Sequence, residues 1–134
     1  MSERIGSIRK TVVELYETQR GIVVRKYHKE RSKIESQMQK RIAEILSIED
    51  VGKVNAYVFS DRLTIELSFS TLVTKEFICN ITDEVMPYVE QLNKLYVDYT
   101  SDMRRLNEWY SKTLKALIED KELPSFPELM LEER

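Results

Sequence analysis

The chain has 134 residues, a formal net charge of −2, and charged side chains at 33% of its positions. This length suits a single domain, residues 1–134, and is sufficient to bury a core without disulfides or metals. One cysteine excludes an internal disulfide, and only three glycines and three prolines leave few turn residues. The composition therefore predicts a mostly α protein of the α+β class, a helical bundle with coiled-coil-like patterning.

The charges are distributed unevenly along the chain. Residues 1–41 hold 11 basic and 5 acidic side chains, whereas residues 42–134 hold 10 basic and 18 acidic ones. Such asymmetry indicates either a nucleic-acid surface or association between unlike halves. No apolar run is long enough to span a membrane, and none follows the basic start as it would in a signal peptide. We therefore expect a soluble, cytoplasmic protein without a membrane partner.

The first predicted element is a basic helical segment, residues 1–48. Gly21 could end one helix and begin another, but no Ser, Thr, Asn or Asp follows it to cap a new helix. We favour one long helix that is weakened or bent at Gly21, with a break there as the alternative. The apolar residues at helical spacing are Ile5, Ile8, Val12, Leu15, Val23, Tyr27, Ile34, Met38, Ile42 and Ile45.

The next predicted element is a β-hairpin, residues 53–70. Within residues 62–70, apolar and polar side chains alternate at every second position, which is the period of a strand. The alternating apolar residues are Leu63, Ile65, Leu67 and Phe69. Because a lone hairpin is not stable in water, its apolar face must pack on helices or pair with another chain.

Residues 82–121 are predicted to form a long amphipathic helix, capped by Thr82 or Asp83, after a segment at 70–81 that is either a short helix or an extended link. Its apolar residues follow a heptad pattern that is broken only at Thr113. The candidate core or oligomer stripe consists of Val89, Leu92, Tyr96, Tyr99, Met103, Leu106, Trp109 and Tyr110. Its aromatic rings could stack on bases, but they share the stripe with aliphatic residues, which favours packing.

The apolar stripe of this helix is wider than a coiled-coil seam. The flanking g positions carry Tyr88, Leu95, Asp102, Trp109 and Ala116, where a two-stranded coiled coil would carry mostly charged residues. One partner helix cannot cover such a stripe. Either the first helix folds back in two pieces, or a second subunit completes the core, and we expect a homo-oligomer.

Residues 122–134 form an acidic tail that contains two prolines. The segment KELPSFP fits a pattern that some proline-rich ligands present to aromatic surfaces, although two prolines that end a helix explain it more simply. The following ELMLEE segment is a candidate for docking on the same or a neighbouring chain.

The sequence predicts no catalytic, metal or cofactor site. One His and one Cys cannot supply a zinc site, and no glycine-rich phosphate-binding pattern occurs. Cys79 lies in the apolar context FICNI, so we expect a small buried hydrophobic residue rather than a nucleophile. We expect neither an enzyme nor a small-molecule substrate.

The segment VVRKYHKERSK, residues 23–33, is the main functional lead in the sequence. On a helix, its cations fall on the face opposite Val23 and Tyr27, while Arg31 can pair with Glu35. This basic stripe consists of Arg25, Lys26, Lys29, Lys33 and Lys40. Three interpretations stay open: a solvated helix face, a contact for an acidic protein, or a phosphate-tracking surface for nucleic acid.

The order of a long helix, a β-hairpin and a long helix is similar to that of prefoldin β-type subunits. That resemblance implies hairpins that assemble an oligomer and helical coils that hold clients. The wide aromatic stripe and the proline-containing tail depart from a free two-stranded coil. We therefore predict a non-enzymatic oligomeric assembly or adaptor protein, with sequence-nonspecific nucleic-acid binding as the alternative.

Overall fold

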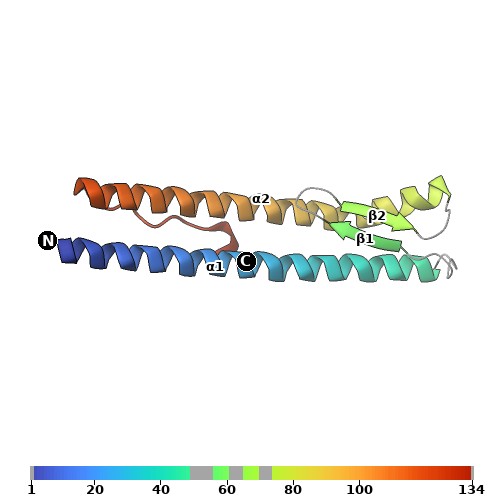
Figure 1. Cartoon of the computed structure of the whole chain (residues 1–134). Coiled ribbons are helices and arrows are strands. Elements are labelled where there is room, and N and C mark those ends of the chain that lie inside the picture. Colours follow the sequence, from blue (N-terminus) through green and yellow to red (C-terminus); the bar gives the residue numbers. More distant parts are fainter. Residues whose placement is uncertain (1, 49–55, 61–64, 70–73, 134) are drawn as a thin grey trace. The chain divides into compact units, whose positions relative to one another are not determined.

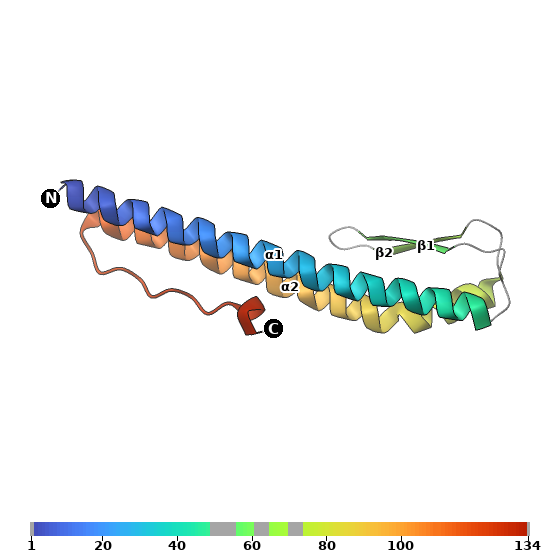
Figure 2. The ribbon, with the colours of Figure 1, turned by 90° about the horizontal axis from the view of Figure 1, so that it is seen from below.

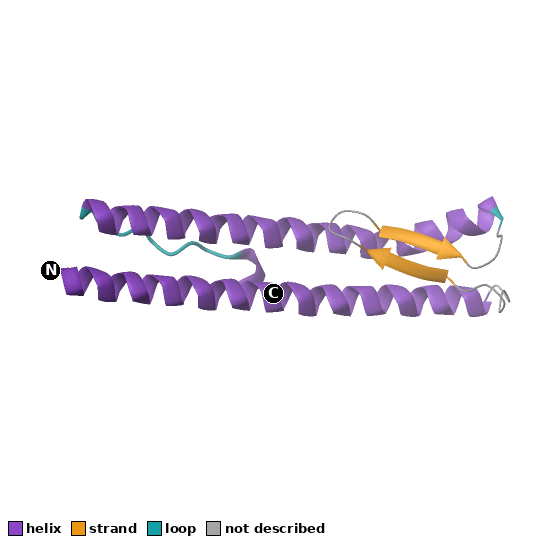
Figure 3. Cartoon of the chain, viewed as in Figure 1, coloured by secondary structure: helices purple, strands orange, loops and turns teal. Residues whose placement is uncertain are grey.

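A computed structural model of the chain describes residues 2–48, 56–60, 65–69 and 74–133, and it is mostly helical (Figures 1 and 3). The elements in chain order are α1 (Ser2–Ile48), β1 (Ala56–Ser60), β2 (Ile65–Phe69), α2 (Lys75–Glu119) and the short 3-10 helix η1 (Met130–Glu133). The prediction of a mostly helical, bundle-like protein is confirmed. Neither described helix is long and apolar enough to cross a membrane.

The chain forms two compact units, each with one part of α1 and one part of α2. The first, here called the tail unit, contains residues 1–28 and 97–134. The second, called the strand unit, contains residues 29–96.

The helix α1 is continuous through Gly21, so the break considered at that position does not form. No side chain or backbone atom crowds the glycine, because the nearest group is the guanidinium of Arg25, at 3.5 Å from where a Cβ would lie. Gly21 therefore lowers the helix propensity of this turn without supplying a conformation that only glycine can adopt.

The buried residues of α1 repeat every eleven positions. The fully or nearly fully buried side chains with this spacing are Val12, Val23, Ile34 and Ile45, and Tyr27 and Met38 follow the same interval. Eleven residues make three turns of 3.67 residues, close to the natural period of an α-helix. One face of α1 therefore stays apolar along nearly its whole length without strong supercoiling.

The helix α2 begins at Lys75, seven residues before the predicted start at Thr82, so the predicted N-terminal boundary is wrong. Thr74 is the N-cap: its Oγ1 accepts a hydrogen bond from the Phe77 N–H at 3.2 Å, and its carbonyl accepts one from the Ile78 N–H at 3.1 Å. Pro87 lies inside the helix, which continues past it. The cap at Thr74 fixes which side chains of the first turns face inward, and these are Phe77, Ile81 and Val85.

The C-terminal end of α2 is a left-handed cap. Asp120 has a φ of 55°, and the Lys121 N–H donates to the Ala116 carbonyl at 2.9 Å. This bond spans five residues, as in the Schellman motif, with aspartate where glycine is commonest. The cap reverses the chain, which then runs back along α2 to η1 (Figure 2).

Two tyrosine pairs set the helix register of the tail unit. Tyr16 stacks on Tyr110, and Tyr27 stacks on Tyr99, each with ring centroids 4.2 Å apart. The Tyr16 hydroxyl also donates a hydrogen bond to Oδ1 of Asn107. Because the two tyrosines are eleven residues apart on each helix, both pairs specify the same antiparallel register.

In the strand unit, β1 and β2 pair antiparallel, with Ala56 opposite Phe69, Val58 opposite Leu67 and Ser60 opposite Ile65. Residues 53–55, 61–64 and 70 of the predicted hairpin lie outside the described residues, so the complete hairpin stays a prediction. The helical part of this unit buries Ile34, Met38 and Ile42 of α1, and Ile81, Val85, Leu92 and Leu95 of α2.

Candidate functional site

The predicted stripe of α2 lies in the protein's own core to different extents. Leu92, Leu106 and Trp109 are buried, whereas the remaining five residues of the stripe are half-buried. These five are Val89, Tyr96, Tyr99, Met103 and Tyr110. The centre of the buried face is displaced from the predicted seam towards the g positions, where Leu95, Asp102, Trp109 and Ala116 are all buried.

In the tail unit, the chain's own C-terminal segment contacts two of these g positions, Asp102 and Trp109. The tail, residues 121–133, places Phe126 against Trp109 in an edge-to-face arrangement with ring centroids 5.1 Å apart. Its Leu129 and Leu131 are almost fully buried. Burial of two leucines contributes about 3–6 kcal/mol of favourable transfer free energy before the entropy of ordering the tail is subtracted.

A buried carboxylate anchors the end of the tail. Asp102 has an exposed fraction of 0%, and its two oxygens accept hydrogen bonds from the first backbone N–H groups of η1. The Met130 N–H donates to Oδ1 at 2.7 Å, and the Leu131 N–H donates to Oδ2 at 2.9 Å. Asp102 therefore caps η1 from a different helix, and its negative charge is paired with N–H groups that lack an intrahelical acceptor.

A second bond holds the tail one turn of α2 away from Asp102. Arg105 Nη1 donates to the carbonyl of Glu128 at 3.0 Å. Asp102, Arg105 and Trp109 thus lie within two turns of α2 and each contacts a different part of the tail; we call them the tail-contact face. Both polar contacts are made to backbone atoms of the tail, while Phe126 and the two leucines supply the side-chain specificity.

The tail-contact face is the structural feature that the sequence patterns do not identify. The signal in the sequence is Asp102, a carboxylate at a g position between the apolar residues Leu95 and Trp109. A charge buried there requires hydrogen-bond or ionic partners. The predicted alternatives for covering the stripe were a folded-back first helix or a second subunit. In the tail unit α1 is unbroken and the tail contributes to the cover instead, which agrees with docking of the ELMLEE segment on the same chain.

Three buried polar atoms of the tail unit have no hydrogen-bond partner among the described residues: Gln19 Oε1, Trp109 Nε1 and Thr113 Oγ1. Trp109 and Thr113 are one turn apart on α2, on the side that includes the tail-contact face. An unpaired buried polar atom costs about 1–3 kcal/mol relative to its hydration in the open state. Within the tail-contact face, Trp109 therefore keeps an unsatisfied indole N–H while its ring contacts Phe126.

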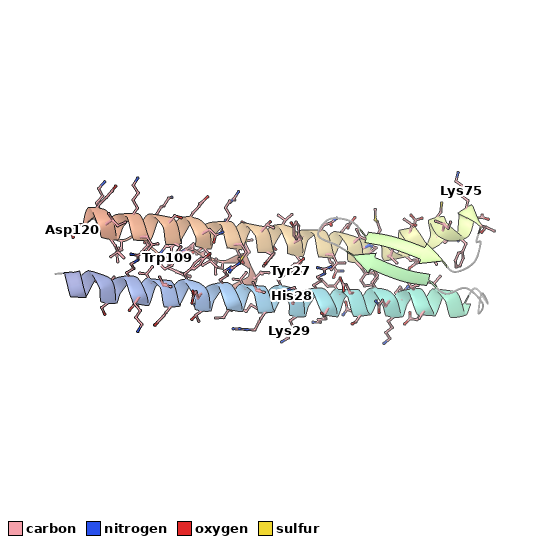
Figure 4. All side chains as sticks on the ribbon, in the orientation of Figure 1. Tyr27, His28, Lys29, Lys75, Trp109 and Asp120 are labelled. Carbon is pink, nitrogen blue, oxygen red and sulfur yellow. The ribbon has the colours of Figure 1, made fainter. Side chains whose placement is uncertain are left out.

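The basic stripe lies on the surface of α1, as predicted. Arg25, Lys29, Lys33 and Lys40 are exposed and Lys26 is half-buried; Lys29 points outward in Figure 4. Within the part of the chain that the structure describes, none of these five cations is in an ion pair. Arg31 pairs with Glu35 at 2.8 Å, which confirms the predicted intrahelical pair.

The exposed guanidinium of Arg25 lies against its own helix. Its Nη1 lies over the bare backbone of Gly21, so the side chain runs back along α1. His28 is exposed and tilted against the ring of Tyr27, with centroids 5.4 Å apart.

A second charged cluster joins the two helices within the strand unit. Arg41 Nη2 lies 2.9 Å from Glu84 Oε2, and Arg41 Nη1 lies 3.1 Å from Glu44 Oε2. The hydrogen bond to Glu84, followed by that to Glu44, raises the pKa of Arg41 above its usual value. Arg41 therefore stays charged at any working pH and acts as a surface cross-link rather than a titrating group.

The expectation that Cys79 is buried is wrong. The thiol is free and exposed, because the helix that starts at Lys75 directs Phe77 and Ile81 inward and leaves Cys79 on the outer face. Among the described residues, no group of three or more His, Cys, Asp or Glu side chains is placed to hold a metal ion.

The described part of the chain holds a linear segment of its own sequence against α2 and displays a row of exposed cations on α1. Its most specific feature is the tail-contact face, where two helical turns recognise a linear segment through backbone and side-chain contacts. Comparisons with protein families, with curated proteins and with solved structures find no match to this chain.

Proposed function

We propose that the chain is a non-enzymatic assembly or adaptor protein that works by protein–protein contact and self-association. The observation that supports this proposal best is the tail-contact face, on which a paired-helix scaffold binds a linear segment of its own chain. A scaffold that completes its core with an added segment has a surface of the kind that protein-interaction modules use to bind linear segments.

The hairpin at residues 53–70 is the second surface in this proposal. Two paired strands are not stable alone, and both edges of a two-stranded sheet present unpaired backbone groups. In the proposed assembly, the apolar residues of the second strand pack against another chain. Exposed apolar side chains of α2 in the same unit, Ile78 with 40% and Met86 with 48% exposure, add to the contact area.

Light scattering between about 10 μM and 1 mM tests the assembly, with a range chosen to include weak association. We expect the mass to rise with concentration above 15.9 kDa. Leu67→Asp should weaken the association, whereas Ser68→Asp, the next residue on the same strand, should not. A parent protein that stays monomeric over the whole range would contradict the proposal.

Nucleic-acid binding is the second candidate function. Its support is the exposed basic stripe on α1, whose cations have no acidic partner among the described residues. Such a surface would track phosphates through counterion release and would be nearly blind to sequence.

The Lys29→Glu/Lys33→Glu double variant tests this candidate against Lys112→Glu/Lys115→Glu, which makes the same charge change at exposed positions of α2. If the stripe binds duplex DNA, the first variant loses binding and the slope of log K against log salt falls by about 0.9 for each lost phosphate contact. Equal affinity of the parent and the first variant for DNA and RNA would exclude the stripe.

A further inference from the structure

The contacts that hold the tail do not depend on the segment that connects it to α2. Three hydrogen bonds and one ring contact join Asp102, Arg105 and Trp109 to tail residues from Phe126 to Leu131. The connecting residues 120–125 make none of these contacts. Any chain that presents the same tail residues can therefore make the same bonds.

The connecting segment has more reach than the distance it spans, so its length does not restrict the tail to its own chain. Phe126 contacts Trp109, which lies ten residues, or about 15 Å, before the end of α2. Seven extended steps from Glu119 to Phe126 reach about 24 Å. The segment is mostly exposed and contains only one proline, so it is a short flexible connection rather than part of the core.

We propose that the tail-contact face binds the tail of a second copy of this chain, so that two copies exchange residues 121–133. This inference rests on the proposed assembly function and names one of its contacts. Because the bonds formed within a chain and between chains are identical, they cancel in the exchange equilibrium. The difference that remains is the effective concentration of the chain's own tail, which is on the order of millimolar for a short flexible connection.

The unpaired polar atoms of the tail unit bear on how readily the tail opens, and not on the exchange equilibrium. Trp109 keeps a buried indole N–H without a partner while its ring contacts Phe126, and Thr113 keeps a buried hydroxyl one turn further along α2. Unsatisfied buried groups make this part of the core less stable than a fully satisfied core, so the tail opens more readily and exchange is faster. The same atoms are unpaired when the tail of a second copy is bound, so their cost cancels between the two forms.

A complementation experiment with two full-length variants tests the exchange. Leu131→Asp places a charge at a tail position with 1% exposure, so this chain has an intact face and an inactive tail. Asp102→Asn/Arg105→Ala removes polar contacts of the face and leaves the tail intact. Circular dichroism verifies that both variants keep the helicity of the parent. A fluorophore on the single exposed Cys79 of one partner reports on binding.

Each variant alone should be monomeric at micromolar concentration, and the equimolar mixture should double in mass from 15.9 kDa and raise the anisotropy of the label. The matched control replaces Leu131→Asp with Ser125→Asp, at an exposed position of the connecting segment. That chain keeps its own tail docked, so its mixture should stay monomeric.

A Leu131→Asp mixture whose mass and label anisotropy equal those of the control mixture up to about 500 μM would overturn the exchange, since the competing intramolecular tail, on the order of millimolar, is absent there. The parent protein's own oligomer is measured separately. If the parent associates while the complementation mixture gains nothing over the control mixture, the exchange is refuted and the assembly function stands on another surface.

Discussion

Asp102→Asn is the sharpest test of how the tail is held. The carboxylate accepts hydrogen bonds from the Met130 and Leu131 N–H groups at 2.7 and 2.9 Å, and hydrogen bonds to charged groups contribute about 1.5–3 kcal/mol each. Asparagine keeps one acceptor oxygen and turns an NH2 group towards the other N–H. We therefore expect the free energy of tail docking to fall by about 2–4 kcal/mol.

Native-state hydrogen exchange measures this loss directly, because the two affected amides are the reporters. A loss of 2 kcal/mol corresponds to about 30-fold faster exchange at Met130 and Leu131. Global stability should fall less, since destabilisation of the tail cannot exceed its own free energy of docking. Glu108→Gln, the same change at an exposed position of α2, should leave both amides unaffected.

The reasoning would be refuted if both amides exchanged at the parent rate in Asp102→Asn. A double-mutant cycle provides a second check. In the Leu131→Asp background, where the tail is released, Asp102→Asn should have little further effect, because the N–H groups it would affect are already in water.

Three further changes should alter stability in ways that the backbone and the surface charges specify. Gly21→Ala should raise the free energy of unfolding by about 0.5–1 kcal/mol, because its Cβ meets only the Arg25 guanidinium at an ordinary contact distance; an unchanged or lower melting temperature would contradict this. Asp120→Gly should raise the free energy of unfolding by about 1 kcal/mol, because it removes the left-handed strain at the cap. The gain should appear as a higher denaturant midpoint, and Asp120→Ala should not produce it. Arg41→Ala should lower the melting temperature at low salt and less so near 1 M salt. Since the pKa of Arg41 is raised in the folded chain, its stabilising contribution is lost only above that pKa, and melting at pH 7 and pH 10 should show the same deficit.

The helical architecture was predictable from local patterns, and the boundaries were less so. The heptads of α2 and the helical spacing of α1 each identified a long helix. The start of α2 was misplaced because Thr74 precedes a run with Phe77 and Ile78, whose bulky side chains match a strand as well as a helix. Because α2 starts at Lys75, the rotational position of its first turns places Cys79 on the exposed face.

The tail-contact face was beyond local reasoning because its parts are far apart in the sequence. Asp102 and Leu131 are separated by 29 residues, and nothing near either one requires the other. The sequence did show that the g positions of α2 are apolar and that the C-terminal segment is amphipathic. Bringing the two together requires the chain reversal at Asp120, where no glycine or asparagine marks a left-handed residue.

The reversal at Asp120 also links the length of α2 to the direction in which the tail departs. One inserted residue between Trp109 and Asp120 rotates the last turn by about 100°, so the chain would leave the helix on a side that does not lead to Asp102. The extended residues 121–125 have no such angular requirement, and they have more reach than the distance demands. Insertions and deletions that keep the protein intact should therefore accumulate in that short connection and be excluded from the last three turns of α2.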